Sequence, residues 1–247
     1  MKTFWLKISA PFAAFRGFQA GVYRSTAPVM PPSAAYGLVL NLAGIEMRDY
    51  SNPKTTGIRQ DLPNLQLAIG IVDKRIENEK EQGRQSWQPE KSSTYQQLHS
   101  YPVGNSGKEL AALTKGAKFW ITPVRREMLI GYVGVVGVQT DDETLREKVD
   151  KGLRGEIERK YGLPFAGDNN FLFDEIEVLA EPPENVIWYV QHQSSDQQVK
   201  GSCRLYISIN RTDNSQTTSS IFVPKESLRL PLPENAWTWI PQEDSHS

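Results

Sequence analysis

The stretch FWLKISAPFAAFRGFQAGVYRSTAPVMPPSAAYGLVLNLAG, from Phe4 to Gly44, contains the two local signals that decide the fold. Apolar residues occupy every second position over Phe4–Ile8, which is the period of a β-strand with one face on a core. Later in the stretch, Ser33 stands where a helix N-cap is expected, and Gly44 stands where a helix ends. The sequence therefore predicts a strand, a long loop, and a helix over residues 34–43.

Two further strand regions follow this opening. Alternating apolar residues over Leu65–Ile71 predict a second strand, and strand composition returns over Phe119–Val138. Gly131, Gly134 and Gly137 in the second region suggest β-bulges or a close approach of backbones. Their spacing matches neither the dinucleotide-binding nor the phosphate-loop motif, so they give no evidence of a nucleotide cofactor.

The segment 73–118 between these regions has no apolar periodicity and is rich in Glu, Lys, Gln, Ser and Gly. A segment of this length in a compact domain is usually functional or disordered. We predict a long insertion that acts either as a binding arm or as a linker. Its scattered aromatic residues favour an arm.

The second half begins with a strong helix signal. Thr140 and Glu143 form a capping box, and apolar residues recur at every fourth position over Leu145–Tyr161, so a helix is expected to end at Gly162. Turn-forming clusters then separate three predicted strands, at residues 175–179, 186–191 and 204–209.

This order of elements predicts an α+β fold. Residues 1–180 are expected to form a ferredoxin-like (RRM-like) βαββαβ domain, the architecture of RNA-recognition modules, with residues 73–118 inserted as a thumb. Residues 181–247 are expected to form a β-rich C-terminal extension. Because many unrelated functions occupy this fold, the function has to be argued from the site.

Charge is divided unevenly along the chain. Residues 1–127 contain 17 Lys+Arg and 10 Asp+Glu, whereas residues 128–247 contain 11 and 19, so the two parts carry +7 and −8. A basic first half allows a surface for a polyanion without requiring one.

Several chemistries have no support in the sequence. Cys203 is the single cysteine, which excludes an internal disulfide and fits a reducing cytosol. No apolar run is long enough to span a bilayer, so we expect a soluble cytoplasmic protein without a membrane partner. His99, His192 and His246 have no metal-ligand spacing, and no hydrolase nucleophile motif is present. We therefore expect no metal, no cofactor and no catalytic set.

The loop from Pro11 to Pro32 interleaves aromatic and basic side chains, namely Phe12, Phe15, Phe18 and Tyr23 with Arg16 and Arg24. Aromatic rings stack on unpaired bases, and a guanidinium group forms bidentate hydrogen bonds with phosphate oxygens. Phe12 and Phe15 fit a hydrophobic core equally well. The two arginines are therefore the better candidates for RNA contact.

The stretch TFWLKISAPFAAFRGFQAGVYRSTAPVMPPSAAYGLVLNLAGIE, residues 3–46, resembles the opening of the CRISPR-associated Cas five (Cas5) family of type I complexes. It combines a first strand running to Pro11, the Phe15–Arg16 pair, a Pro-rich turn and a helix ending at Gly44. The segment Pro123–Leu129, with its Arg-Arg-Glu sequence, looks like the family's strand after the insertion.

The resemblance implies an RNA-binding subunit of a type I CRISPR surveillance (Cascade) complex that caps the 5′ handle of the guide RNA (crRNA). It also implies contacts with the Cas seven backbone and Cas eight large subunits, and with target DNA only through the complex. Matching positions imply an RNA-binding set of Arg16, Tyr23, Arg24, Ser25, Asn41, Arg125 and Arg126. In the expected thumb, Gln97, His99 and Tyr101 complete the set.

Two other functions remain open from the sequence. Some members of the family cleave precursor RNA without a metal. The unperturbed pKa of a histidine such as His99 is close to neutrality, which suits a general base. Binding is favoured over cleavage, because acid–base chemistry needs a fixed geometry that a mobile insertion would not readily supply. The third alternative is a protein-only scaffold whose aromatic loop belongs to the core.

Overall fold

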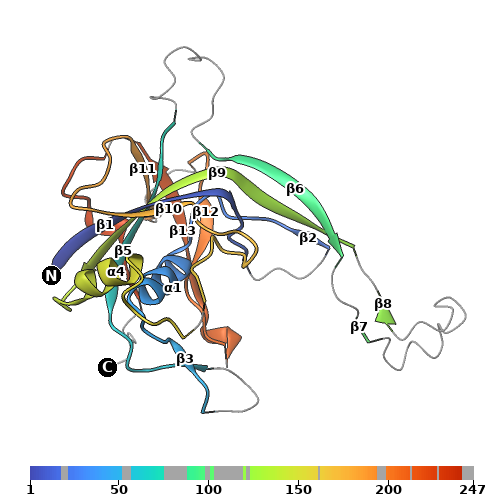
Figure 1. Cartoon of the computed structure of the whole chain (residues 1–247). Coiled ribbons are helices and arrows are strands. Elements are labelled where there is room, and N and C mark those ends of the chain that lie inside the picture. The colour runs from blue at the N-terminus through green and yellow to red at the C-terminus, as the bar shows by residue number, and fades with distance from the viewer. Residues whose placement is uncertain are drawn as a thin grey trace, which may run out of the picture.

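The structure is a computed structural model (Figure 1), and it describes residues 1–17, 22–51, 57–74, 88–97, 101–102, 119–120, 123–160, 162–193, 199–211, 213–226 and 228–240. Its helices are α1 (Pro32–Leu42) and α4 (Leu145–Leu153), with 3₁₀ turns at Asn214–Gln216 and Glu234–Ala236. Neither helix has the length and hydropathy needed to cross a bilayer in this described part of the chain.

Antiparallel strands dominate the molecule. A ten-stranded sheet has the order β10-β1-β9-β5-β11-β13-β12, with β14 paired to β5, and with β2 and β6 paired to β9. Its strands are β1 (Lys2–Ala13), β2 (Tyr23–Arg24), β5 (Leu65–Val72), β6 (Glu90–Gln97), β9 (Pro123–Thr140), β10 (Glu175–Leu179), β11 (Val186–Gln191), β12 (Cys203–Ser208), β13 (Thr218–Lys225) and β14 (Trp237–Ile240). Two small pairs join β3 (Arg48–Asp49) to β4 (Gly57–Ile58) and β7 (Tyr101–Pro102) to β8 (Phe119–Trp120).

Strand β9 connects the body of the molecule to a projecting arm. Its second part pairs with β1 and β5, whereas its first part, from Pro123 to Ile130, pairs with β6. Figure 1 shows β6 and this part of β9 leaving the body together as a long hairpin. Strand β2 pairs with Arg125 and Arg126 of β9, which places it on the outer half of this arm (Figure 1).

Both faces of the sheet in the body are covered. The larger core packs Phe4, Leu6 and Ile8 of β1 against buried residues of α1 and α4, including Leu40 and Val149. A second cluster on the opposite face joins Trp5 to Trp188 and Leu232. The alternation over residues 4–8 therefore predicted the strand and its main core face, but not the burial of Trp5 on the other face.

The predicted helices differ from α1 and α4 at their ends. Helix α1 begins at Pro32, and its N-cap is Pro31 without a side-chain cap bond, so the expected Ser33 cap is wrong. Proline fits the first helical position because it has no amide hydrogen to leave unpaired.

Helix α4 ends at Leu153, nine residues before the predicted stop at Gly162. Thr140 belongs to β9, and its hydroxyl accepts from the Asp142 N–H, so it does not begin a capping box. Gly155 has φ +75°, in the left-handed region that ends a helix. Ile157 then packs so closely on Gly44 that a Cβ there would lie 2.4 Å from it.

Strand β6 lies inside the segment 73–118, where no regular structure was expected. Its sequence EKSSTYQQ is polar on both faces, and its described side chains are mostly exposed. At the coarse level the α+β prediction holds, since the molecule is mostly sheet with two helices. Strand β11, which follows residue 180, pairs with β5 in the same sheet. The boundary at residue 180 stays a prediction.

Candidate nucleic-acid interface

The outer half of the arm brings four of the predicted site residues together. In the parallel pairing of β2 with β9, Tyr23 is opposite Arg125, and Arg24 is opposite Arg126. Because successive side chains point to opposite faces of a strand, these two pairs lie on different faces. The N–H of Arg125 donates to the Val22 carbonyl at 2.7 Å, which fixes the register.

On one face, three arginines gather at a buried carboxylate. The Arg16 guanidinium donates to Asp168 Oδ2, and Arg126 Nη1 donates to the same oxygen at 3.2 Å. Arg24 is next to Arg126 in the β2–β9 ladder. We call Arg16, Arg24 and Arg126 the arginine cluster.

The arginine cluster keeps unused donors. The Nε atoms of Arg24 and Arg126 are buried and have no hydrogen-bond partner among the described residues. Burial and the charge of Arg16 lower the pKa of the Arg126 guanidinium, and Asp168 acts in the opposite direction. Buried donors in a cationic site are satisfied well by an anion that accepts several hydrogen bonds, such as a phosphate.

On the other face, Tyr23 is 46% exposed, and its hydroxyl donates to Glu127. Glu127 also accepts from the Thr26 N–H at 3.0 Å and lies 3.7 Å from Lys91 Nζ. The hydrogen bond to Glu127 and burial raise the pKa of Tyr23. Burial acts to raise the pKa of Glu127, but the bonds from Tyr23 and Thr26 outweigh it and lower that pKa.

On the same face, Arg125 contacts one residue of β6 and one of β2. Its Nε donates to Ser93 Oγ at 2.9 Å, and its guanidinium carbon lies 5.8 Å from the centre of the Tyr23 ring, which is a cation–π distance. The exposed Tyr23 ring and Arg125 therefore form a flat surface of the kind on which bases stack.

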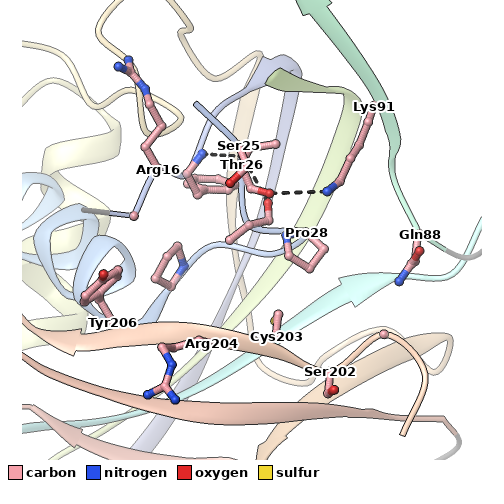
Figure 2. Close-up of a pocket in the computed structure, with 15 residues that line it drawn as sticks. Arg16, Ser25, Thr26, Pro28, Gln88, Lys91, Ser202, Cys203, Arg204 and Tyr206 are labelled. Atoms are coloured by element: carbon pink, nitrogen blue, oxygen red, sulfur yellow. Dashed lines mark hydrogen bonds between the residues drawn. The ribbon is translucent and has the colours of Figure 1, made fainter. Parts of the chain in front are cut away.

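A pocket of about 440 Å³ lies between the first loop and the C-terminal strands. Figure 2 shows Ser25, Thr26 and Lys91 on one side, and Cys203 and Tyr206 of β12 on the other. Lys91 Nζ donates to the Thr26 carbonyl at 3.5 Å. The Arg16 side chain extends away from the pocket, toward Asp168 (Figure 2).

The remaining predicted residues are not joined to this surface. Asn41 is 6% exposed, and its Nδ2 donates to the Gly162 carbonyl at 3.4 Å, so its amide supports the packing of α1. Gln97 ends β6, and Tyr101 pairs with Trp120 in β7–β8, but their side chains are not described. His99 lies outside the described residues.

The structure resolves the two alternatives for the loop phenylalanines. Phe15 is 2% exposed and packs edge-on against Tyr132, so it belongs to the core. Phe12 is 41% exposed and packs on Phe171 with 5.9 Å between ring centres.

Sequence reasoning missed Asp168, Glu127 and Lys91 as parts of the site. Asp168 stands in a Gly-Asp-Asn-Asn turn, where an aspartate needs no partner beyond its own backbone. Only the folded structure shows that its carboxylate accepts a hydrogen bond from Arg16, which lies 152 positions earlier in the chain. Among the described residues, no group of three or more His, Cys, Asp or Glu side chains could hold a metal ion.

The fold and this surface define a class of protein: a mostly antiparallel β molecule, with two helices in its described part and a cationic surface on the outer half of a projecting hairpin. Within that class, the chain belongs to the family described as "CRISPR-associated protein (Cas_Cas5)", whose model matches residues 3–162.

A solved structure has a similar fold. A structure described as "CRISPR RNA-guided surveillance complex" matches with a TM-score of 0.53 and 14% identity, over 91% of this chain and 90% of that chain. Another, described as "Crystal structure of Cas protein", has a TM-score of 0.44 and 10% identity, over 95% and 100% of the two chains. A comparison with curated proteins finds no match.

Proposed function

We propose that this chain is the subunit of a CRISPR surveillance complex that holds the 5′ handle of the guide RNA on the outer half of its arm, where β2 pairs with β9. The observation that carries the proposal is the arginine cluster, in which two buried Nε–H donors have no partner among the described residues. Phosphate groups supply acceptors in the geometry that guanidinium groups prefer.

The second face supports the same function. Tyr23 has an exposed ring, and the Arg125 guanidinium lies beside it. Both are within reach of an RNA strand that crosses the arm. Stacking and phosphate contacts of this kind bind single-stranded RNA. In this proposal the chain binds RNA without cleaving it.

The likeness to a surveillance-complex subunit supports assembly with the Cas seven backbone and Cas eight large subunits, and contact with target DNA through them. The element order supports a ferredoxin-like βαββαβ unit. In the sheet, β10, β1, β9 and β5 are neighbours in that order and all antiparallel, while α1 precedes β5 and α4 follows β9. That arrangement suits the architecture of RNA-recognition modules.

A nuclease-protection experiment tests the proposal. Purified protein is mixed with a guide RNA that carries the repeat-derived 5′ handle, and single-strand-specific nuclease digestion is mapped along the RNA. We expect protection of the handle nucleotides and none of a guide whose handle has been scrambled. Equal digestion with and without protein would instead favour a protein-only scaffold.

A further inference from the structure

Asp168 is an acidic residue at the centre of a surface that we propose binds a polyanion. Its side chain is 4% exposed, and it lies in the loop between α4 and β10. By charge alone, a carboxylate at this place should weaken RNA binding, because it repels phosphate. Its position therefore needs an explanation.

The contacts of Asp168 are divided between its two oxygens. Oδ2 accepts from Arg16 and from Arg126 Nη1, which come from the first loop and from β9. Oδ1 accepts from the N–H of Asn170 at 3.1 Å and from its Nδ2 at 3.0 Å. One carboxylate thus joins two arginines that otherwise repel each other, and Asn170 fixes the rotation of that carboxylate.

The loop that carries Asp168 is fixed to the body immediately beside Arg16. The Ala14 N–H donates to the Ala166 carbonyl at 2.9 Å. Gly167 has φ +80°, and a Cβ at this glycine would lie 2.4 Å from the Ala14 carbonyl oxygen. This close approach and left-handed backbone require glycine, and they hold Asp168 in place through the backbone.

We propose that Asp168 is a positioning residue for RNA: it holds the Arg16 and Arg126 guanidinium groups in one arrangement, so that their remaining donors face a phosphate together. This inference rests on the proposed function. Preorganised donors bind better than the same donors spread by mutual repulsion, and supporting residues supply that organisation.

Replacing the carboxylate distinguishes a positioning role from a purely electrostatic one, because the two roles predict opposite changes in RNA affinity. Asp168→Asn keeps the size of the side chain and removes one negative charge. A purely electrostatic role predicts tighter RNA binding, whereas positioning predicts binding about tenfold weaker. Asp174→Asn is the matched control, because Asp174 is exposed in the same segment and has no ion pair among the described residues. It should bind RNA as tightly as the wild type or slightly more tightly.

The measurement is fluorescence anisotropy of a labelled guide RNA that carries the 5′ handle, over a series of salt concentrations, with thermal unfolding of each variant as a check. Loss of one organised phosphate contact lowers the slope of log affinity against log salt by about 0.7. Weaker binding with this shallower slope supports positioning. Unchanged or tighter binding by Asp168→Asn, or weaker binding with the wild-type slope, overturns it.

Asn170→Ala decides the question if Asp168→Asn does not fold. Asn170 is exposed, and the substitution removes only the Nδ2 bond to Asp168 while leaving every charge unchanged. Positioning predicts measurably weaker RNA binding by this variant, and equal binding overturns it. If the wild-type protein itself does not bind RNA, the proposed function fails and not only this inference.

Discussion

At the scale of single residues, the structure separates two arginines that the sequence treated alike. The sequence names both Arg16 and Arg24 as candidates for RNA contact. Arg24 has no ion pair among the described residues, whereas Arg16 is only 24% exposed and donates to the buried Asp168. Their substitutions should therefore differ in stability.

Arg24→Ala should weaken RNA binding and flatten its salt dependence while leaving the free energy of unfolding nearly unchanged. Arg16→Ala should do the same and also destabilise the fold by about 1–3 kcal/mol, because a charge-assisted hydrogen bond to a buried carboxylate is lost. Urea unfolding of both variants checks this. Equal stabilities would mean that the Arg16–Asp168 pair contributes nothing to the fold.

Cys203 gives a prediction that depends on pH. Burial raises the pKa of its thiol to about 12 from 9.0, and the charge of Lys91 acts weakly in the opposite direction. At pH 8 the folded protein should therefore react with iodoacetamide far more slowly than the urea-unfolded protein, in which the pKa returns toward 9.0. Equal rates in the two states would show that the thiol is accessible and its pKa ordinary.

At the scale of elements, a strand could be predicted from the sequence where one of its faces is buried in a core. β1, β5 and β11 were visible in the sequence because their apolar residues face a core. β6 was missed because it pairs only with β9 and has no core face. The overlong second helix has a similar physical cause: Ile157 continues the apolar spacing of α4 but packs against Gly44 from a turn. The Asp168 contact with Arg16 was beyond sequence reasoning, since no local pattern marks it.

Gly137 of β9 tests the packing of this strand against Trp5 and Trp237. A Cβ at Gly137 would lie 2.4 Å from Cζ3 of Trp5 and 3.1 Å from Trp237, whereas a Cβ at Gly155 would meet nothing within 4 Å. Gly137→Ala should destabilise the protein by about 1–3 kcal/mol, the usual effect of overpacking. Gly155→Ala introduces only the backbone strain of its positive φ, about 1–2 kcal/mol.

Thermal unfolding by circular dichroism, extended by urea titration, compares the two glycine variants. Activity need not be measured, because Gly137 lies in the body, away from the arginine cluster. The account of β9 packing is contradicted if Gly137→Ala is as stable as the wild type.

The arm supplies the other prediction at this scale. Tyr95 of β6 is 75% exposed and lies opposite Arg125 in the β6–β9 ladder. Tyr95→Ala should leave the melting temperature nearly unchanged, because an exposed ring buries little surface, but it should weaken RNA binding by removing a stacking surface. Thr94→Ala, one position earlier on the opposite face, is the control. Equal RNA affinities of wild type and Tyr95→Ala would exclude that ring from the interface.

At the scale of the whole molecule, the account joins a body with two covered sheet faces to a polar arm, and it puts the binding surface on the outer half of that arm. The division of charge along the sequence agrees with this arrangement, since the basic first 127 residues supply Arg16, Arg24, Arg125 and Arg126. The acidic remainder supplies Asp168, which organises two of them.

Ultraviolet crosslinking tests the central claim, that guide RNA lies across the arm where β2 pairs with β9. The purified protein is irradiated with a guide RNA that carries the 5′ handle, and the crosslinked peptides are identified by mass spectrometry. The account predicts crosslinks within residues 22–26 and 123–127, which disappear when the handle is scrambled. Crosslinks confined to α4 and β10, or none above the level of the scrambled guide, would contradict it.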